Sequence, residues 1–154
     1  MADQMMADPM MERITAAIAL AQGGERVEAA RAFDALWAEI GADGDPFHRC
    51  TLAHFMADVQ DDPEQELLWD QRALAAADGL DDERAQAWHS SLQVRGFYPS
   101  LHLNLAEDYR KLGRPEQARA HLEQATATLD ALPDDGYGQL IRGGVARLAE
   151  LLTG

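Results

Sequence analysis

Apolar residues recur every three or four positions along almost the whole chain. One stretch that shows the pattern clearly contains Val27, Ala30, Phe33, Trp37 and Ile40. This spacing places the side chains on one face of an α-helix. No stretch of useful length alternates between apolar and polar residues, as a half-buried strand would. The pattern predicts an all-α chain, with helices over residues 9–22, 25–40, 46–60, 63–78, 82–94, 99–112, 115–131 and 137–152.

Asp-Pro pairs mark three of the predicted helix starts. They are Asp8-Pro9, Asp45-Pro46 and Asp62-Pro63. An Asp at the N-cap accepts hydrogen bonds from amides of the first turn. A Pro at the next position has no amide hydrogen, but an amide at this position would have no acceptor within the helix. Two further starts are predicted at Pro99 and Pro115. Helices are expected to stop near Gly23-Gly24, Gly41, Gly79, Gly113 and Gly136.

A repeated pattern is clearest late in the chain. From Asn104 to Ala125 the sequence reads N-L-A-x2-Y-x3-G-x4-A-x3-L-x2-A. Gly113 is placed to turn the chain between two helices, and Ala106 and Ala118 are small enough to let the two backbones approach. Leu105, Tyr109 and Leu122 are expected to fill the space around that contact.

This run resembles the tetratricopeptide repeat, whose period of about 34 residues is two helices and a tight turn. A fair earlier copy has Gly24, Ala29 and Phe33 at the corresponding positions, and a weak middle copy has Asp61 and Glu66 in place of Gly and Ala. The resemblance implies an α-solenoid of about three antiparallel helix pairs, with an inserted helix and a C-terminal capping helix. The predicted organisation is a flexible N-terminus over 1–8 and a single domain over 9–152. Its units are about 9–40, 46–78 and 99–131, with the inserted helix at 82–94 and the cap at 137–152.

Tetratricopeptide proteins are binding scaffolds, in which the first helix of each pair lines a concave groove for a peptide or a partner helix. Carried onto this chain, the groove residues are His48, Thr51, Leu52, Phe55, Ser100, Leu103, Asn104, Glu107, Arg110 and Lys111. The first unit would add Ile14, Thr15 and Ile18. Equally, these residues could be ordinary solvated or cap-packed surface. A clamp for a terminal carboxylate is disfavoured, because Leu103, Thr51 and Phe55 occupy positions where such a clamp needs polar or basic groups.

Charge and composition restrict the class of partner that the chain is expected to bind. The chain of 154 residues has a net charge of −14, which opposes binding to a nucleic-acid backbone. The one basic stretch contains Arg110, Lys111, Arg114 and Arg119, and it is interleaved with Glu107, Asp108 and Glu116. No apolar run approaches the roughly 20 residues that a membrane helix needs. The Met-rich start carries Asp3 and Asp8 in place of the basic residues of an export signal, so we expect a cytoplasmic protein with a protein or peptide partner.

Residues that could carry chemistry are few. Cys50 is the only cysteine, which excludes an internal disulfide. Cys50, His54 and Asp58 are four residues apart and could face one way as zinc ligands, but two of them fall on repeat positions that normally pack between helices. No nucleotide-binding, metalloprotease or nucleophile-elbow motif is present. We therefore predict no enzymatic activity, no metal and no cofactor.

The predicted insertion and its flank carry a second candidate surface, composed of Trp88, His89, Arg95 and Tyr98. Its aromatic residues could simply pack the extra helix onto the stack, as large apolar residues usually do. Alternatively, the four residues could extend the groove or form a dimer contact. Two other functions stay open: a self-assembling homodimeric structural protein, and a small-ligand sensor with its site between the stack and the insertion, using His89 and Arg95.

Overall fold

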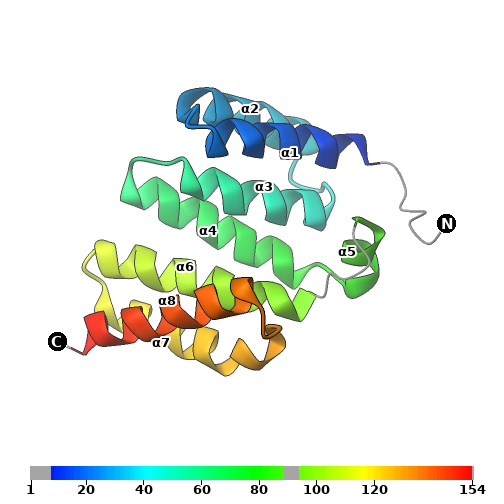
Figure 1. Ribbon diagram of the computed structural model, residues 1–154. Helices are drawn as coiled ribbons and strands as arrows, with labels where there is room; N and C mark the ends of the chain where they lie inside the picture. Colours follow the sequence, from blue (N-terminus) through cyan, green and yellow to red (C-terminus); the bar gives the residue numbers. More distant parts are fainter. Residues whose placement is uncertain (1–7, 89–93, 154) are drawn as a thin grey trace. The chain divides into compact units, whose positions relative to one another are not determined.

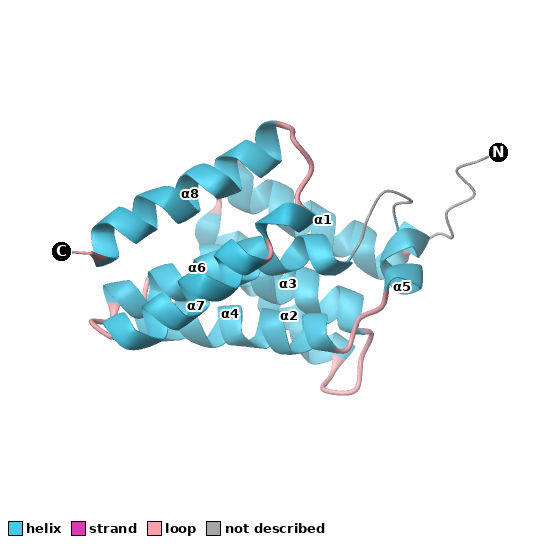
Figure 2. Cartoon of the chain, turned by 90° about the horizontal axis from the view of Figure 1, so that it is seen from below, coloured by secondary structure: helices cyan, strands magenta, loops and turns pink. Residues whose placement is uncertain are grey.

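The computed structural model describes residues 8–88 and 94–153, and every regular element in this part of the chain is helical (Figures 1 and 2). The all-α prediction is confirmed for these residues. The elements are α1 (Pro9–Gln22), α2 (Arg26–Ile40), α3 (Pro46–Asp58), α4 (Pro63–Asp78), α5 (Asp82–Trp88), the 3-10 turn η1 (Val94–Phe97), α6 (Tyr98–Lys111), α7 (Pro115–Ala127), the 3-10 turn η2 (Leu129–Ala131) and α8 (Gly136–Leu152). None of the described helices is long and apolar enough to cross a membrane.

The chain divides into two compact units, and each is described by itself. Unit 1 covers Met1–Gln93 and unit 2 covers Val94–Gly154. The prediction that both belong to one domain over 9–152 stays a prediction. Residues 1–7, which we expected to be flexible, lie outside the described residues.

The Asp-Pro pairs start helices as predicted. The carboxylate of Asp8 accepts a hydrogen bond from the Met11 amide at 3.0 Å. Asp45 and Asp62 cap α3 and α4 in the same way, through amides two residues further on at 2.9 and 3.2 Å. Pro99 and Pro115 lie in the first turns of α6 and α7. These starts depend on contacts within one helical turn, which explains why the local sequence is sufficient to locate them.

One predicted helix ends earlier than expected, and another is described only in part. Of the helix predicted over 82–94, α5 covers Asp82–Trp88, residues 89–93 lie outside the described residues, and Val94 begins a 3-10 turn. The helix predicted over 115–131 is interrupted after Ala127, and η2 follows. Near that break the hydroxyls of Thr126 and Thr128 donate to main-chain oxygens four residues back, each at 2.9 Å. Such side-chain bonds compete for the helix's own acceptors and weaken its last turn.

Unit 1 is built from two helix pairs. α1 packs against α2 and α3 packs against α4, and α3 also contacts both α1 and α2 (Figure 1). Ile14, Phe33 and Leu52 are fully buried, one each from α1, α2 and α3. The two pairs therefore share a single apolar core, in which α3 has neighbours on several sides.

Unit 2 contains the pair α6–α7, with α8 packed against both helices. Gly113 turns the chain between α6 and α7 with a φ of 73°, a conformation that favours glycine. Ala106 and Ala118 are completely buried in one cluster with Leu148 and Leu152 of α8. Both small residues are therefore buried in one cluster, as expected for a contact between α6 and α7.

Substitution at Ala118 tests this packing. We expect Ala118→Leu to lower the free energy of unfolding by about 1–3 kcal/mol, because added methylenes have no space in a close helix contact. Ala120→Leu, at an exposed position of the same helix, serves as the matched control and should change stability by less than about 0.5 kcal/mol. Urea unfolding followed by circular dichroism measures both. Equal midpoints for the two variants would contradict the close approach.

Candidate functional site

The predicted groove residues of unit 1 do not all reach the surface. His48, Thr51 and Phe55 are half-buried on α3. Leu52 is 0 % exposed, so its side chain belongs to the core and cannot contact a partner. The physical reason is that α3 packs against α1, α2 and α4, which leaves little of its surface uncovered.

Unit 2 brings three of the predicted groove residues together. Leu103, Asn104 and Glu107 of α6 line one side of a cleft of about 220 Å³. The other side consists of Gly144, Arg147, Leu148 and Leu151 of α8. Two further predicted residues, Arg110 and Lys111, lie at the end of the same helix, whereas Ser100 is buried and donates its hydroxyl to the Phe97 carbonyl at 3.2 Å.

Gly144 lies in the wall of this cleft, opposite Leu103. A Cβ atom added at Gly144 would lie 2.9 Å from a terminal methyl group of Leu103, whereas a Cβ added at Gly143 would meet nothing within 4 Å. Glycine at 144 therefore allows the Leu103 side chain to pack directly against the backbone of α8. Gly143, the preceding residue, is exposed. A side chain added at Gly143 would point in a direction about 100° around the helix axis from one added at Gly144.

Charged residues of both signs lie at the cleft. Glu107 forms two hydrogen bonds with the Arg110 guanidinium, at 2.7 and 2.8 Å. These bonds lower the pKa of Glu107 in spite of its partial burial, and the positive charges of Arg110, Lys111 and Arg147 add to the effect. Arg147 itself makes no hydrogen bond or ion pair within the described residues. The cleft itself is lined by one cation, Arg147, and one anion, Glu107.

An exposed apolar face of α8 continues from the cleft. Four large apolar side chains are exposed in the described part of the chain, and three of them lie on α8: Tyr137 at 50 %, Leu140 at 70 % and Leu151 at 49 %. They share one helix face with two cleft residues, because the successive spacings are three and four. We call this face the α8 stripe; it consists of Tyr137, Leu140, Gly144, Arg147 and Leu151. The sequence pattern predicted only a capping helix over 137–152. The apolar residues of this helix nevertheless cover a wider arc than a single buried face requires.

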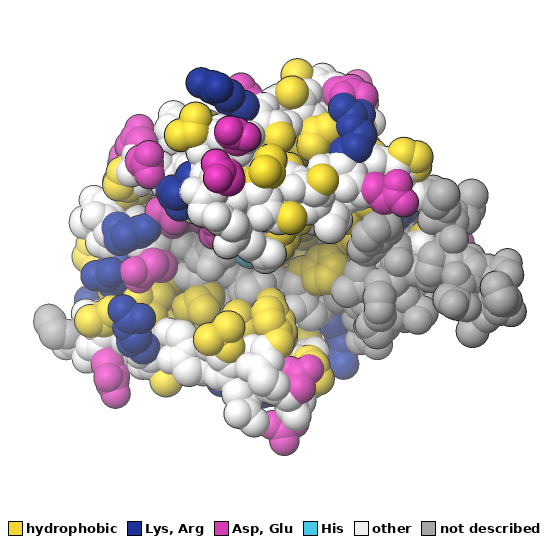
Figure 3. Space-filling view, turned by 45° about the horizontal axis from the view of Figure 1, so that its top comes forward, with side chains coloured by type: hydrophobic (Ala, Val, Ile, Leu, Met, Phe, Trp, Pro, Cys, Tyr) yellow, Lys and Arg dark blue, Asp and Glu magenta, His cyan; other side chains and the backbone are white. Residues whose placement is uncertain are grey.

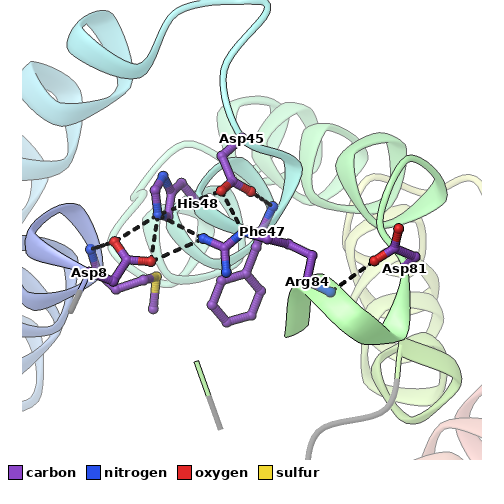
Figure 4. A network of polar contacts seen from close by, with 7 residues as sticks. Asp8, Asp45, Phe47, His48, Asp81 and Arg84 are labelled. Carbon is purple, nitrogen blue, oxygen red and sulfur yellow. Dashed lines mark hydrogen bonds and ion pairs between the residues drawn. The ribbon is translucent and has the colours of Figure 1, made fainter. Parts of the chain in front are cut away.

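A second polar arrangement lies in unit 1, where the N-termini of α1 and α3 meet α5 (Figure 4). The Arg84 guanidinium donates to Asp45 at 2.6 Å and to Asp8 at 3.0 Å. The Nε2 atom of His48 lies 3.0 Å from each carboxylate oxygen of Asp8. We call these four residues the N-cap cluster. Nothing in the local sequence pattern indicates Arg84, because its partners lie 39 and 76 residues away.

Opposing effects act on the pKa of Asp8. Partial burial raises it, whereas hydrogen bonds from His48, the Met11 amide and Arg84 lower it, and the net effect is a pKa below the ordinary Asp value of 3.8. The carboxylate form is therefore the one that the cluster stabilises. Its side chains satisfy one another, which is the arrangement of a structural contact.

Of the chemical candidates of α3, Cys50 is buried, His54 is half-buried and Asp58 is exposed. Burial raises the pKa of the Cys50 thiol to about 12, so the thiol stays protonated and is a poor nucleophile and a poor metal ligand. Partial desolvation by the surrounding protein lowers the pKa of His54 and raises that of Asp58, which favours the neutral form of each group. The structure therefore gives no support to a zinc site at these residues.

The surface predicted around the insertion is described only in part. His89 and the side chain of Trp88 lie outside the described residues, and Arg95 is exposed. Tyr98 is half-buried, and its ring stacks on His102 with centroids 6.1 Å apart. His102 in turn shares a hydrogen bond with His121 of α7, with 3.0 Å between their Nδ1 atoms. In the described residues Tyr98 thus contributes to packing within unit 2.

The two units differ strongly in charge. Unit 1 contains nineteen acidic and six basic residues, whereas unit 2 contains eight and seven, so their net charges are −13 and −1. On the face that Figure 3 shows, acidic and basic side chains of the described residues are interspersed. Most of the negative charge of the chain thus belongs to unit 1.

Comparisons with known proteins identify no relative. The chain matches no family model, no curated protein and no solved structure. The candidate functional surfaces are those that its own residues form. They are the cleft between α6 and α8, the adjoining α8 stripe, and the N-cap cluster, whose side chains bond to one another.

Substitution at Asp8 tests the N-cap cluster. Asp8→Asn keeps an acceptor for the Met11 amide but removes the charge that Arg84 and His48 contact, so we expect a loss of about 1.5–3 kcal/mol at pH 7. Asp62→Asn is the matched control: it changes an exposed cap of the same type and should have almost no effect. Chemical unfolding of both variants provides the measurement.

The pH dependence of the free energy of unfolding provides an independent test of the N-cap cluster. Because the folded pKa of Asp8 lies below 3.8, its contribution to stability is complete above the unfolded value and is lost as the pH falls through the folded value. The stability difference between the wild type and Asp8→Asn should therefore shrink below pH 3.8. A difference that stays constant down to pH 2 would contradict the ion-pair assignment.

Proposed function

We propose that this chain is a non-catalytic protein–protein interaction module with a tetratricopeptide-like solenoid, which binds a peptide or a partner helix on the α6–α8 surface of unit 2. In this role it would act as an adaptor or as a regulator of another protein. The surface consists of the cleft and the α8 stripe.

Packing within each unit supports the solenoid. The pairs α1–α2, α3–α4 and α6–α7 each consist of consecutive helices, and α3 contacts both helices of the preceding pair. This is the packing expected where one helix pair stacks on the next. The α6–α7 pair also has Gly113 at its turn and Ala106 and Ala118 at its closest contact, as the repeat requires.

One observation carries the binding proposal: the apolar lining of the cleft adjoins the exposed apolar residues of the α8 stripe. Leu103, Leu148 and Leu151 supply the apolar lining. Tyr137 and Leu140 extend it along α8, and Arg147 borders it. Exposed apolar faces rimmed by polar residues are typical of protein-binding sites, and a helix-in-groove contact uses anchors at this spacing.

The buried state of Cys50 supports a non-catalytic role, because its protonated thiol is withdrawn from any substrate. In the N-cap cluster, the carboxylates of Asp8 and Asp45 are engaged by Arg84 and by main-chain amides. Neither arrangement offers an accessible nucleophile beside an uncommitted base, which acyl-transfer and hydrolytic chemistry need.

Filling the cleft tests the proposal. In affinity capture from a cell extract of the source organism, the tagged wild type should retain a partner that Gly144→Leu loses by tenfold or more, because the new side chain collides with Leu103 and displaces it into the cleft. Gly143→Leu is the matched control, since it adds the same side chain one position away, towards open space. Quantitative mass spectrometry of the captured proteins provides the measurement.

Folding is checked separately for both variants by helical circular dichroism and thermal melting. Exchange of a helical glycine adds up to about 1 kcal/mol of helix propensity in each case, so neither variant should melt below the wild type unless Leu103 cannot move. Captured proteins that are retained equally by folded Gly144→Leu and Gly143→Leu would eliminate the cleft as the binding site.

A further inference from the structure

We infer that His102 of α6 and His121 of α7 form an acid-sensitive contact, which joins these two helices at neutral pH and is lost when both imidazoles are protonated. We call the two residues the histidine pair. The inference goes beyond the proposed function, because it concerns the response of unit 2 to pH and requires no bound partner. Its basis is the distance between two ring nitrogens, the number of protons that the rings can share, and their surroundings.

The two imidazole rings of the histidine pair meet at their nitrogen edges. The Nδ1 atoms lie 3.0 Å apart, whereas the ring centroids are 5.3 Å apart and the ring planes differ by 25°. The nitrogens are thus much closer together than the ring centres. Each ring presents Nδ1 to the other, at the distance of an ordinary hydrogen bond.

This hydrogen bond limits the number of protons on the pair. A neutral imidazole carries a hydrogen on one ring nitrogen and a lone pair on the other, so one histidine must donate from Nδ1 and the other must accept there. One added proton can bind to Nε2 of the donating ring, and the bond remains. A second added proton must bind to the accepting Nδ1, and two N–H groups on two positive rings then face each other. The pair therefore tolerates one positive charge but not two.

The surroundings of the histidine pair disfavour positive charge. His102 is buried, with 6 % of its surface exposed, and His121 is half-buried. The ring of Tyr98 lies 6.1 Å from that of His102, and the ring of Tyr109 lies 5.5 Å from that of His121 with the planes within 10°. The two tyrosines thus cover both ends of the pair and keep water from it. Burial lowers the pKa of His121, which favours its neutral form.

In the described part of unit 2, the charged side chains of α6 and α7 point away from the histidine pair. The residues three and four positions from each histidine, which share its helix face, are uncharged. They are Tyr98, Pro99, Leu105 and Ala106 on α6, and Gln117, Ala118, Gln124 and Ala125 on α7. Asp108, the buried acid of α6, lies six residues from His102 and about 120° around the helix axis.

The elements that pack on α6 and α7 carry their charges elsewhere. On α8, Arg142 donates to main-chain oxygens at η2 and just after it, Arg147 lines the cleft, and Glu150 is exposed. Arg95 of η1 and Asp130 of η2 are also exposed. Burial is accordingly the cause of the lowered pKa of His121, and no charged neighbour in the described part of the chain contributes to it.

Nitrogen NMR of the isotope-labelled full chain tests the proton arrangement directly. Correlations between ring nitrogens and ring protons distinguish the two neutral tautomers and the charged form of each of the five histidines. Near neutral pH, we expect Nδ1 to be protonated in one member of the pair and unprotonated in the other. We also expect His121 to titrate below its ordinary value of 6.5. Unprotonated Nδ1 atoms in both rings, or a His121 that titrates at 6.5 or above, would overturn the inference.

Substitution of His121 tests the effect on the helix pair. His121→Asn places an amide group near the Nδ1 position, where it can share a hydrogen bond with His102 but takes up no proton. Because the folded pKa of His121 lies below 6.5, its contribution to stability is complete above pH 6.5 and is lost as the pH falls through the folded value. From about pH 7.5 to about pH 5, the protection of α7 amides against hydrogen exchange should therefore fall at least about threefold more in the wild type than in His121→Asn.

Leu122→Ala is the matched control, because it removes an apolar contact of the same helix and no titrating group. Its protection factors should lie below those of the wild type by the same factor at both pH values. An acid-dependent loss of protection in His121→Asn equal to that of the wild type would overturn the inference. The NMR titration uses the wild type alone, so it tests the inference even if His121→Asn does not fold.

Discussion

The contact of one guanidinium with two helix-capping carboxylates is the interaction on which the arrangement of unit 1 depends. Asp8 and Asp45 begin α1 and α3, where each satisfies an amide of its own helix. Their negative charges point towards the same region, and Arg84 lies between them (Figure 4). In a unit with a net charge of −13, this cation allows the N-termini of two helices to lie together. The short helix α5, which supplies Arg84, therefore acts as a brace for the two helix pairs.

Helix starts could be predicted from the sequence because they depend on neighbours in the chain. An Asp followed by Pro meets its partners within one turn, and no distant residue is needed. Helix ends were harder to predict, as the break after Ala127 illustrates, because side-chain hydroxyls and 3-10 turns alter the last turn without changing the apolar pattern. The close approach of Ala106 and Ala118 was predictable for a similar reason: both residues keep a fixed distance from the turn at Gly113.

The candidate site could be predicted only in part. Leu103, Asn104 and Glu107 followed from the repeat register, but the opposite wall of their cleft comes from α8, whose residues lie about forty positions later. His48 was placed on a groove, whereas the structure joins it to Asp8, forty residues earlier. Leu52 lies in the core because α3 has more neighbours than a single repeat implies. Each of these differences involves long-range contacts, which periodicity within one segment cannot reveal.

The separation of Arg84 from Asp8 also affects the kinetics of folding. Each helix pair of unit 1 forms from segments adjacent in the chain, whereas this bond joins residues 76 positions apart. Closing so long a loop requires the intervening helices to be in place, so the bond forms late and is largely absent from the folding transition state. Interactions of this kind slow unfolding and have little effect on the folding rate. The N-cap cluster therefore governs the lifetime of folded unit 1 more than the speed at which unit 1 forms.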